Sequence, residues 1–230
     1  GGQALDSPGL DLLGVLVGSE GTLAVVTKVT LRLLRRPEAV QTLLAAFDST
    51  DAAGNAVSEI ISAGIIPAAI EMMDRTTIRA AEAAVHPGFP DAEAVLIVEL
   101  DGPQSEVAAL FAQVEAVCVR NDGWGLQVAR DEAQRARIWM GRKAAFAAMG
   151  RIAPNYYVQD GVIPRTRIPE TLRFIRQVGE RFNLKIANVF HAGDGNLHPN
   201  LLFDRSDPEE VTRVERASTE IMAVCVEAGG

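Results

Sequence analysis

The feature that most constrains the fold is an order of elements that occurs twice between residues 40 and 149: strand, helix, strand, helix. The first set is predicted at residues 40–48, 50–63, 65–71 and 74–85, and the second at 93–101, 105–120, 125–130 and 131–149. Asp51 is the candidate N-cap of the first helix. Two such units of similar size indicate split βαβ building blocks. The sequence therefore predicts an α+β fold with a largely antiparallel sheet and helices on one side of it.

The last third of the chain adds elements of both kinds. We expect a strand at 155–163, a helix at 169–182, a hairpin within 188–204 and a final helix at 208–228. The hairpin segment reads NVFHAGDGNLHPNLLFD, and Asp-Gly between two apolar runs is a strong signal for a two-residue turn. A turn centred on Asp194 and Gly195 places His191 directly opposite His198.

Two opposed histidines on one face of a hairpin favour a metal site. Opposed Cβ atoms lie about 4.5–5.5 Å apart, from which two rings can reach one cation at roughly 2.0–2.1 Å each. The chain has 3 histidines in all, and the presence of two of them in one opposed pair favours the metal site further. The alternative is that His191 and His198 flank a loop and hydrogen-bond to the backbone. Two ligands do not complete a site, so a third, a carboxylate, is expected from elsewhere.

The N-terminal segment reads differently from the rest. Apolar runs at 12–18 and 23–34 have the periodicity of strands and flank a small loop. Pro37 disfavours a helical Arg36 and ends the pattern. We therefore place a domain boundary near residue 37, with residues 1–37 on one side and residues 38–230 on the other.

The loop in the N-terminal segment, GSEGTL, has two interpretations. It is either a glycine-tolerant turn or a place where backbone N–H groups approach an anion or a cofactor ring closely. Its candidate cofactor-binding residues are Gly18, Ser19, Glu20, Gly21 and Thr22. The loop lacks the spacing and the strand-to-helix context of a Rossmann fingerprint, so nicotinamide binding by that route is not supported.

Arg142 and Lys143 lie within the apolar helix segment RIWMGRKAAF. One interpretation is that both are solvated cations whose stems cover apolar surface. The other is that the helix lines a pocket, where Arg142 would hold a carboxylate in bidentate fashion. Further along, Asp160 ends a strand and is a candidate to support a cationic centre, whereas the EMMD stretch at 71–74 is expected to supply core methionines.

Composition excludes several functional classes. A formal net charge of -8 and a pI near 5.0 argue against a nucleic-acid-binding protein. The apolar stretches fall well short of the roughly 20 residues that a membrane-spanning helix needs. Cys118 and Cys225 have no ligand spacing and are expected to be free, buried thiols in a reducing cytoplasm. Neither end of the sequence has the features of a natural terminus, so we expect the chain to be cut from a longer protein at both ends.

A resemblance adds to what spacing alone provides. The chain resembles the flavoenzyme family that includes glycolate oxidase, D-lactate dehydrogenase and D-2-hydroxyglutarate dehydrogenase. The resemblance covers essentially the whole chain and is carried by the segments DSPGLDLLGVLVGSEGTLAVVTKVTLRLL, IIPAAIEMMD, WMGRKAAF and NVFHAGDGNLHPNLLFD. It implies that residues 1–37 are the last strands of an FAD-binding domain. Residues 38–230 would be the substrate-capping domain, ferredoxin-like in architecture and truncated at its C-terminus.

The resemblance also implies roles for single residues. In the family, histidines matching His191 and His198 bind a divalent metal, zinc or a similar ion, and the third ligand is a Glu expected shortly after residue 230. Arg142 and Asn200 match residues of the substrate pocket. Phe146 and Val158 replace, in a hand alignment, a Thr and a Lys that grip dicarboxylates in the hydroxyglutarate enzymes. A short monocarboxylate is therefore the expected substrate.

The implied activity is FAD-dependent oxidation of a 2-hydroxy acid, glycolate or D-lactate, to the 2-oxo acid. The implied partners are a second flavin subunit and an iron–sulfur subunit, and the implied location is the cytoplasm, with association to the inner face of the membrane through those partners. Two other readings stay open: a metal-dependent hydrolase without flavin, and an inactive capping domain used for docking. This segment by itself is expected to be inactive and to lack FAD.

Overall fold

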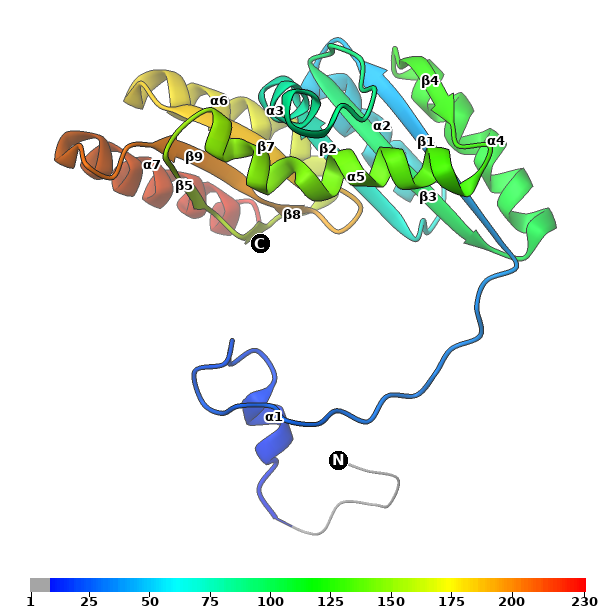
Figure 1. Ribbon diagram of the computed structural model, residues 1–230, viewed down its shortest axis with the longest axis horizontal. Coiled ribbons are helices and arrows are strands. Elements are labelled where there is room, and N and C mark those ends of the chain that lie inside the picture. The colour runs from blue at the N-terminus through cyan, green and yellow to red at the C-terminus, as the bar shows by residue number, and fades with distance from the viewer. Residues whose placement is uncertain (1–8) are drawn as a thin grey trace. The chain divides into compact units, whose positions relative to one another are not determined.

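The computed structural model describes residues 9–230, which belong to two compact units, Gly1–Arg36 and Pro37–Gly230. In Figure 1 the first unit is the dark-blue segment and the second contains all the remaining helices and strands. Each unit is described by itself below. The assignment of the first unit to an FAD-binding domain stays a prediction.

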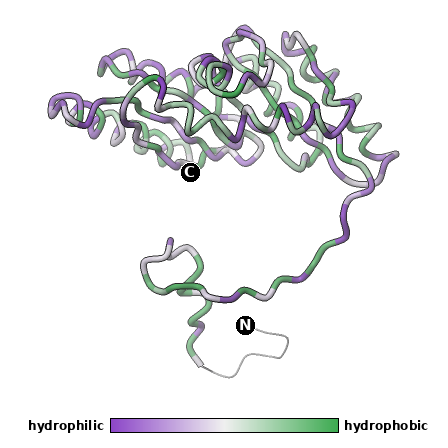
Figure 2. Tube along the Cα trace, in the orientation of Figure 1, coloured by the Kyte–Doolittle hydropathy of each residue, from purple (hydrophilic) through white to green (hydrophobic). Residues whose placement is uncertain are grey.

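The described part of the first unit contains the short helix α1 (Leu12–Leu16) followed by extended chain. The strands expected at 12–18 and 23–34 are therefore not formed. Their apolar side chains are exposed, for example Val25 at 87%, and they stand out as green stretches in Figure 2. A strand gains its stability from hydrogen bonds and side-chain pairs with a neighbouring strand, and this unit supplies no such neighbour among residues 9–36.

The second unit is built on one nine-stranded sheet in which every recorded strand pair is antiparallel. The main order is β4-β1-β3-β2-β7-β8-β6, and β9 pairs with both β5 and β7. The strands are β1 (Ala39–Phe47), β2 (Ala69–Asp74), β3 (Ala94–Gly102), β4 (Trp124–Val128), β5 (Asn155–Val158), β6 (Gly161–Val162), β7 (Lys185–His191), β8 (Asn196–Leu197) and β9 (Pro199–Phe203). The α+β fold with a largely antiparallel sheet is confirmed.

Six α-helices of this unit lie close to their predicted ranges. They are α2 (Thr50–Ser62), α3 (Arg75–Val85), α4 (Gln104–Arg120), α5 (Glu132–Ala148), α6 (Ile168–Phe182) and α7 (Pro208–Glu227), with 3-10 turns at Met149–Arg151 and Arg165–Arg167. The N-cap of α2 is Ser49, whose Oγ accepts a hydrogen bond from Ala52 N at 3.0 Å, and not Asp51 as predicted. No helix of residues 9–230 is long and apolar enough to cross a membrane.

The helices cover both faces of the sheet, which corrects the prediction that they lie on one side. One core cluster joins alternate β1 residues such as Leu43 and Phe47 to α2, α4, α6 and α7. A second cluster joins Leu44 and Ala46 to α3 and α5, which lie in front of the sheet in Figure 1. The reason is that β1 and β3 are continuous apolar runs, and only a strand buried on both faces needs such a run.

Two further differences concern strand limits. The strand predicted at 65–71 lies later in the sequence, at β2 (Ala69–Asp74). The strand predicted at 155–163 divides into β5, which pairs with β9, and β6, which pairs with β8.

Both cysteines are free and buried, as expected. Burial raises the pKa of Cys118 to about 12 and also raises the pKa of Cys225.

Candidate functional site

The hairpin that carries the two histidines has a longer turn than predicted. β7 ends at His191, which pairs with Asn196 and not with His198. The register is therefore shifted by two residues, and the turn spans residues 192–195. Contacts outside the hairpin hold this turn: Gly193 N donates to Ile70 O at 3.0 Å. In addition, Ile163 N donates to the carbonyl of Gly195 at 2.9 Å.

The shift leaves the histidines on a common face, because a change of two residues preserves side-chain direction in a strand. The ring centroids of His191 and His198 are 5.3 Å apart, with an interplanar angle of 85°. Two imidazoles bound to one tetrahedral cation at metal–nitrogen distances of roughly 2.0–2.1 Å would have centroids roughly 5 Å apart. The observed spacing fits two ligands of a single cation.

Each imidazole makes its protein contacts through Nδ1. His191 Nδ1 lies 2.8 Å from Glu71 Oε1. His198 Nδ1 lies 3.3 Å from Gln159 O and 3.6 Å from Asp160 Oδ1. Metal-binding histidines commonly donate one ring N–H to a carboxylate or carbonyl and bind the metal with the other nitrogen. Within residues 9–230, however, no group of three His, Cys, Asp or Glu side chains could hold a metal ion.

Glu71 is the residue of this site that sequence reasoning missed. It lies on β2 directly opposite His191 in the antiparallel pair, and it is 6% exposed. Its Oε2 accepts a hydrogen bond from Arg142 Nε at 2.8 Å, and Arg142 Nη2 forms an ion pair with the same oxygen at 2.8 Å. Apolar residues flank Glu71 on both sides in the sequence, and a carboxylate that is buried must find partners. That signal was available in the sequence.

Arg142 is buried on α5, at 7% exposed, so it is not a solvated cation. Its neighbour Lys143 is exposed, as the alternative reading expects for a solvated cation. The Arg142 guanidinium lies 5.8 Å from the ring centroid of Phe146, and that ring lies 6.2 Å from His198. Helix α5 therefore brings a cation next to the histidine pair.

Asn200 lies on β9, two residues after His198, and is fully buried. Its Nδ2 donates to His198 O at 2.7 Å and to Ala187 O at 3.2 Å. Its Oδ1 is buried without a hydrogen-bond partner among the described residues. The amide therefore supports the backbone beside His198 and retains one unused acceptor. Val158, on the neighbouring strand, pairs with Asn200.

A cavity of about 500 Å³ is lined in part by His191. Its lining includes Glu71, His191, Asp194 and Arg165, together with apolar residues between Ile61 and Ile70. Arg165 Nε also donates to Gly193 O, which ties this cation to the turn. The cavity combines an apolar wall with charged groups, as small-molecule sites usually do.

The GSEGTL loop is described within the first unit alone. Gly18 and Gly21 have φ values of 79° and 77°, and Glu20 between them has φ of 49°. Thr22 N donates to Ser19 O at 2.9 Å, which closes a turn. The loop thus has the left-handed conformations that its glycines predict, and its role toward a cofactor is untested.

Comparisons with known proteins identify the family. Residues 36–230 match the family described as FAD linked oxidases, C-terminal domain. The chain is 50% identical to glycolate oxidase subunit GlcD of Escherichia coli (strain K12), covering 100% of this chain and 46% of that protein. It is 38% identical to GlcD of Bacillus subtilis, covering 100% and 49%. It is 30% identical to the probable mitochondrial D-lactate dehydrogenase of Danio rerio, covering 90% and 42%.

The chain thus spans about half the length of the curated relatives it matches. Among solved structures it is similar to an alkyldihydroxyacetonephosphate synthase, with a TM-score of 0.68 and 16% identity over 96% of this chain and 45% of that one. It is also similar to p-cresol methylhydroxylase with substrate bound, with a TM-score of 0.61 and 12% identity over 83% and 44%. These structures show the fold alone. The chain belongs to the FAD-linked oxidases, and residues 36–230 form the C-terminal domain that is typical of this family.

Proposed function

We propose that this chain forms the substrate side of an FAD-dependent oxidoreductase that oxidises glycolate or D-lactate to the 2-oxo acid. The observation that carries the proposal is the grouping of Arg142, Glu71, His191 and His198 at one place. Relatives named as a glycolate oxidase subunit and as a D-lactate dehydrogenase support the substrate class. A 2-hydroxy acid has a hydroxyl on the carbon next to its carboxylate. Its site therefore needs a cationic side chain for the carboxylate and a polarising group for the hydroxyl.

Arg142 is the proposed carboxylate anchor. Its Nε donates to Glu71 Oε2, and its Nη2 forms an ion pair with the same oxygen. The N–H groups of Nη1 are left for a substrate. Arginine is suited to this task because its planar guanidinium donates several hydrogen bonds in a fixed geometry. The Glu71 pair also fixes the direction in which the guanidinium points.

His191 and His198 are the proposed protein ligands of a divalent cation, zinc or a similar ion. Such a cation, when bound, lowers the pKa of a coordinated hydroxyl as a Lewis acid does for water. Their Nε2 atoms are the proposed metal-binding atoms because Nδ1 of each ring makes the protein contacts. A third ligand is not present among residues 9–230, and we propose a carboxylate from another part of the full protein.

When bound, FAD would supply the acceptor for the hydride of the substrate Cα, and the protein would supply its orientation. The base that takes the hydroxyl proton is proposed to lie outside residues 9–230. We propose that Gly18, Glu20 and Gly21 contribute to its binding through backbone N–H groups, and Ser19 and Thr22 through their hydroxyls. The apolar residues Phe146 and Val158 favour a short monocarboxylate over a dicarboxylate. We further propose that the partners are a second flavin subunit and an iron–sulfur subunit. The proposed location is the cytoplasm, with membrane association through those partners.

The test uses the flavin-loaded holoenzyme, a panel of 2-hydroxy acids and an artificial electron acceptor. Arg142→Met keeps much of the apolar stem and removes the donors, so kcat/KM is expected to fall by about 100-fold or more while the flavin absorbance stays normal. The control is Arg135→Met, which removes an arginine of a partly buried ion pair from the same helix and is expected to keep kcat/KM. Equal kinetics of Arg142→Met and wild type would refute the role of Arg142.

A further inference from the structure

We infer that Glu71 is a positioning residue that fixes the tautomer of His191 and the direction of Arg142. The inference rests on the proposed function, in which His191 binds a cation and Arg142 binds the substrate carboxylate. One carboxylate would then join the two ends of the substrate site.

The geometry gives each oxygen of Glu71 a separate task. Oε1 lies 2.8 Å from His191 Nδ1. Oε2 accepts a hydrogen bond from Arg142 Nε at 2.8 Å and forms an ion pair with Arg142 Nη2 at 2.8 Å. The Glu71 and Arg142 side chains are each 8% exposed, so solvent does not readily replace the contact between them. The His191 side chain is 44% exposed, which leaves its other edge open to a ligand. Glu71 lies within a strand and directly opposite His191, and a group built on a strand is held more rigidly than one on a loop.

An ionised carboxylate accepts hydrogen bonds and cannot donate them. His191 Nδ1 must therefore carry the proton, which leaves the lone pair on Nε2 for a cation. The same carboxylate holds one edge of the Arg142 guanidinium. The separation between cation and guanidinium is thereby set by one side chain, which suits a substrate whose hydroxyl is on the carbon next to its carboxylate.

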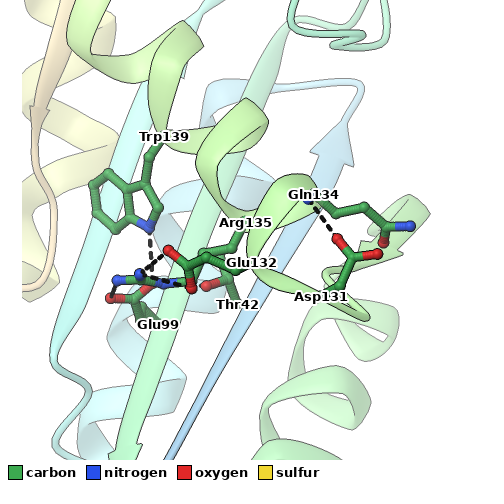
Figure 3. Close-up of polar contacts among 7 residues, drawn as sticks. All are labelled: Thr42, Glu99, Asp131, Glu132, Gln134, Arg135 and Trp139. Carbon is green, nitrogen blue, oxygen red and sulfur yellow. Dashed lines mark hydrogen bonds and ion pairs between the residues drawn. The ribbon is translucent and has the colours of Figure 1, made fainter.

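A second, partly buried pair on the same helix provides a comparison. Arg135 lies seven residues before Arg142 on α5 and donates through Nε and Nη2 to Glu99 at 2.8 Å. Thr42 and Trp139 donate to the same carboxylate, as Figure 3 shows. The Glu99 pair has the same carboxylate–guanidinium chemistry between the same sheet and helix, and it contacts no histidine.

Glu71→Gln tests the tautomer directly. The amide has one acceptor oxygen, and the charged arginine with two N–H groups should take it in preference to a neutral imidazole. The amide N–H then faces His191 Nδ1, which moves the ring proton to Nε2 and blocks the cation. In the holoenzyme we expect the affinity for Zn²⁺, measured against a chelator, to fall by about 10- to 100-fold. Glu99→Gln is expected to leave the Zn²⁺ affinity unchanged.

A second variant distinguishes positioning from general damage. In Glu71→Gln combined with Arg142→Met, the amide oxygen is free to turn to His191 Nδ1–H, so most of the lost Zn²⁺ affinity should return. If Glu71→Gln does not fold, Arg142→Met is compared with Arg142→Met/Glu71→Leu, in which apolar side chains replace the buried pair. Loss of the acceptor in the latter should lower the affinity at least about 10-fold.

The outcomes separate the two proposals. Wild-type holoenzyme that binds no Zn²⁺ would refute the metal site of the proposed function, and the inference with it. Wild-type binding together with equal affinity in Glu71→Gln, or with no recovery in the double variant, would overturn the role of Glu71 and leave the metal site standing. In the leucine comparison, equal Zn²⁺ affinity of Arg142→Met and Arg142→Met/Glu71→Leu would likewise overturn the role of Glu71.

Discussion

Replacing Arg142 by methionine should destabilise the fold as well as impair substrate binding. The change leaves the Glu71 carboxylate buried without its countercharge, and breaking a buried ion pair in this way typically costs about 3–5 kcal/mol. Both side chains are 8% exposed and meet at 2.8 Å. Glu71 keeps its contact with His191, so we expect the lower end of that range, about 3 kcal/mol.

The assay is urea unfolding of four proteins followed by circular dichroism: wild type, Arg142→Met, Glu71→Leu and the double variant. Replacing both charged partners by apolar residues is often neutral or stabilising, so the double variant should be more stable than Arg142→Met. The control is Arg79→Met, which breaks the exposed pair with Asp91 and should leave the unfolding midpoint unchanged. If Arg142→Met loses no more stability than Arg79→Met, the reasoning about the buried pair is wrong.

Three other predictions concern the site and its supports. His191→Ala or His198→Ala in the holoenzyme should lower turnover by orders of magnitude and leave the fold intact; metal content and turnover both at wild-type levels would contradict this. Gly141→Ala places a Cβ 2.6 Å from Phe89 Cε2, and overpacking of about 1–3 kcal/mol should exceed the helix-propensity gain of about 1 kcal/mol, so thermal denaturation should show a lower Tm, not a higher one. Burial alone would raise the pKa of Glu99, but hydrogen bonds from Arg135, Thr42 and Trp139 hold that pKa below its usual value. This stabilisation is present above about pH 4.3 and is lost as the pH falls through the folded pKa. The stability difference between wild type and Glu99→Gln, measured by urea unfolding, should therefore shrink below that pH, and a constant difference would argue against it.

The sequence predicted most elements of the second unit because their periodicity and caps are local properties. It also placed His191 and His198 on one face, although the register was off by two residues. Local turn chemistry favours a two-residue loop at Asp-Gly, but backbone hydrogen bonds to Ile70 and Ile163 hold a longer turn. Those partners are distant in sequence, so no local rule could supply them.

Other features depended on tertiary context in the same way. The first unit has strand periodicity but no partner strand among residues 9–36, so it forms the short helix α1 followed by extended chain. Glu71 was read as part of a methionine-rich core stretch, because its partners Arg142 and His191 are distant in sequence. The coverage of both sheet faces was readable in principle from the continuous apolar runs of β1 and β3.

The two ion pairs of α5 have a consequence for how this domain can vary in length during evolution. Arg135 and Arg142 are seven residues apart, close to two helical turns, and both reach carboxylates of the sheet. Inserting or deleting one residue between them would rotate one arginine by about 100° relative to the other. One pair could then be kept only by losing the other. We expect homologues that retain both pairs to keep this spacing free of insertions and deletions.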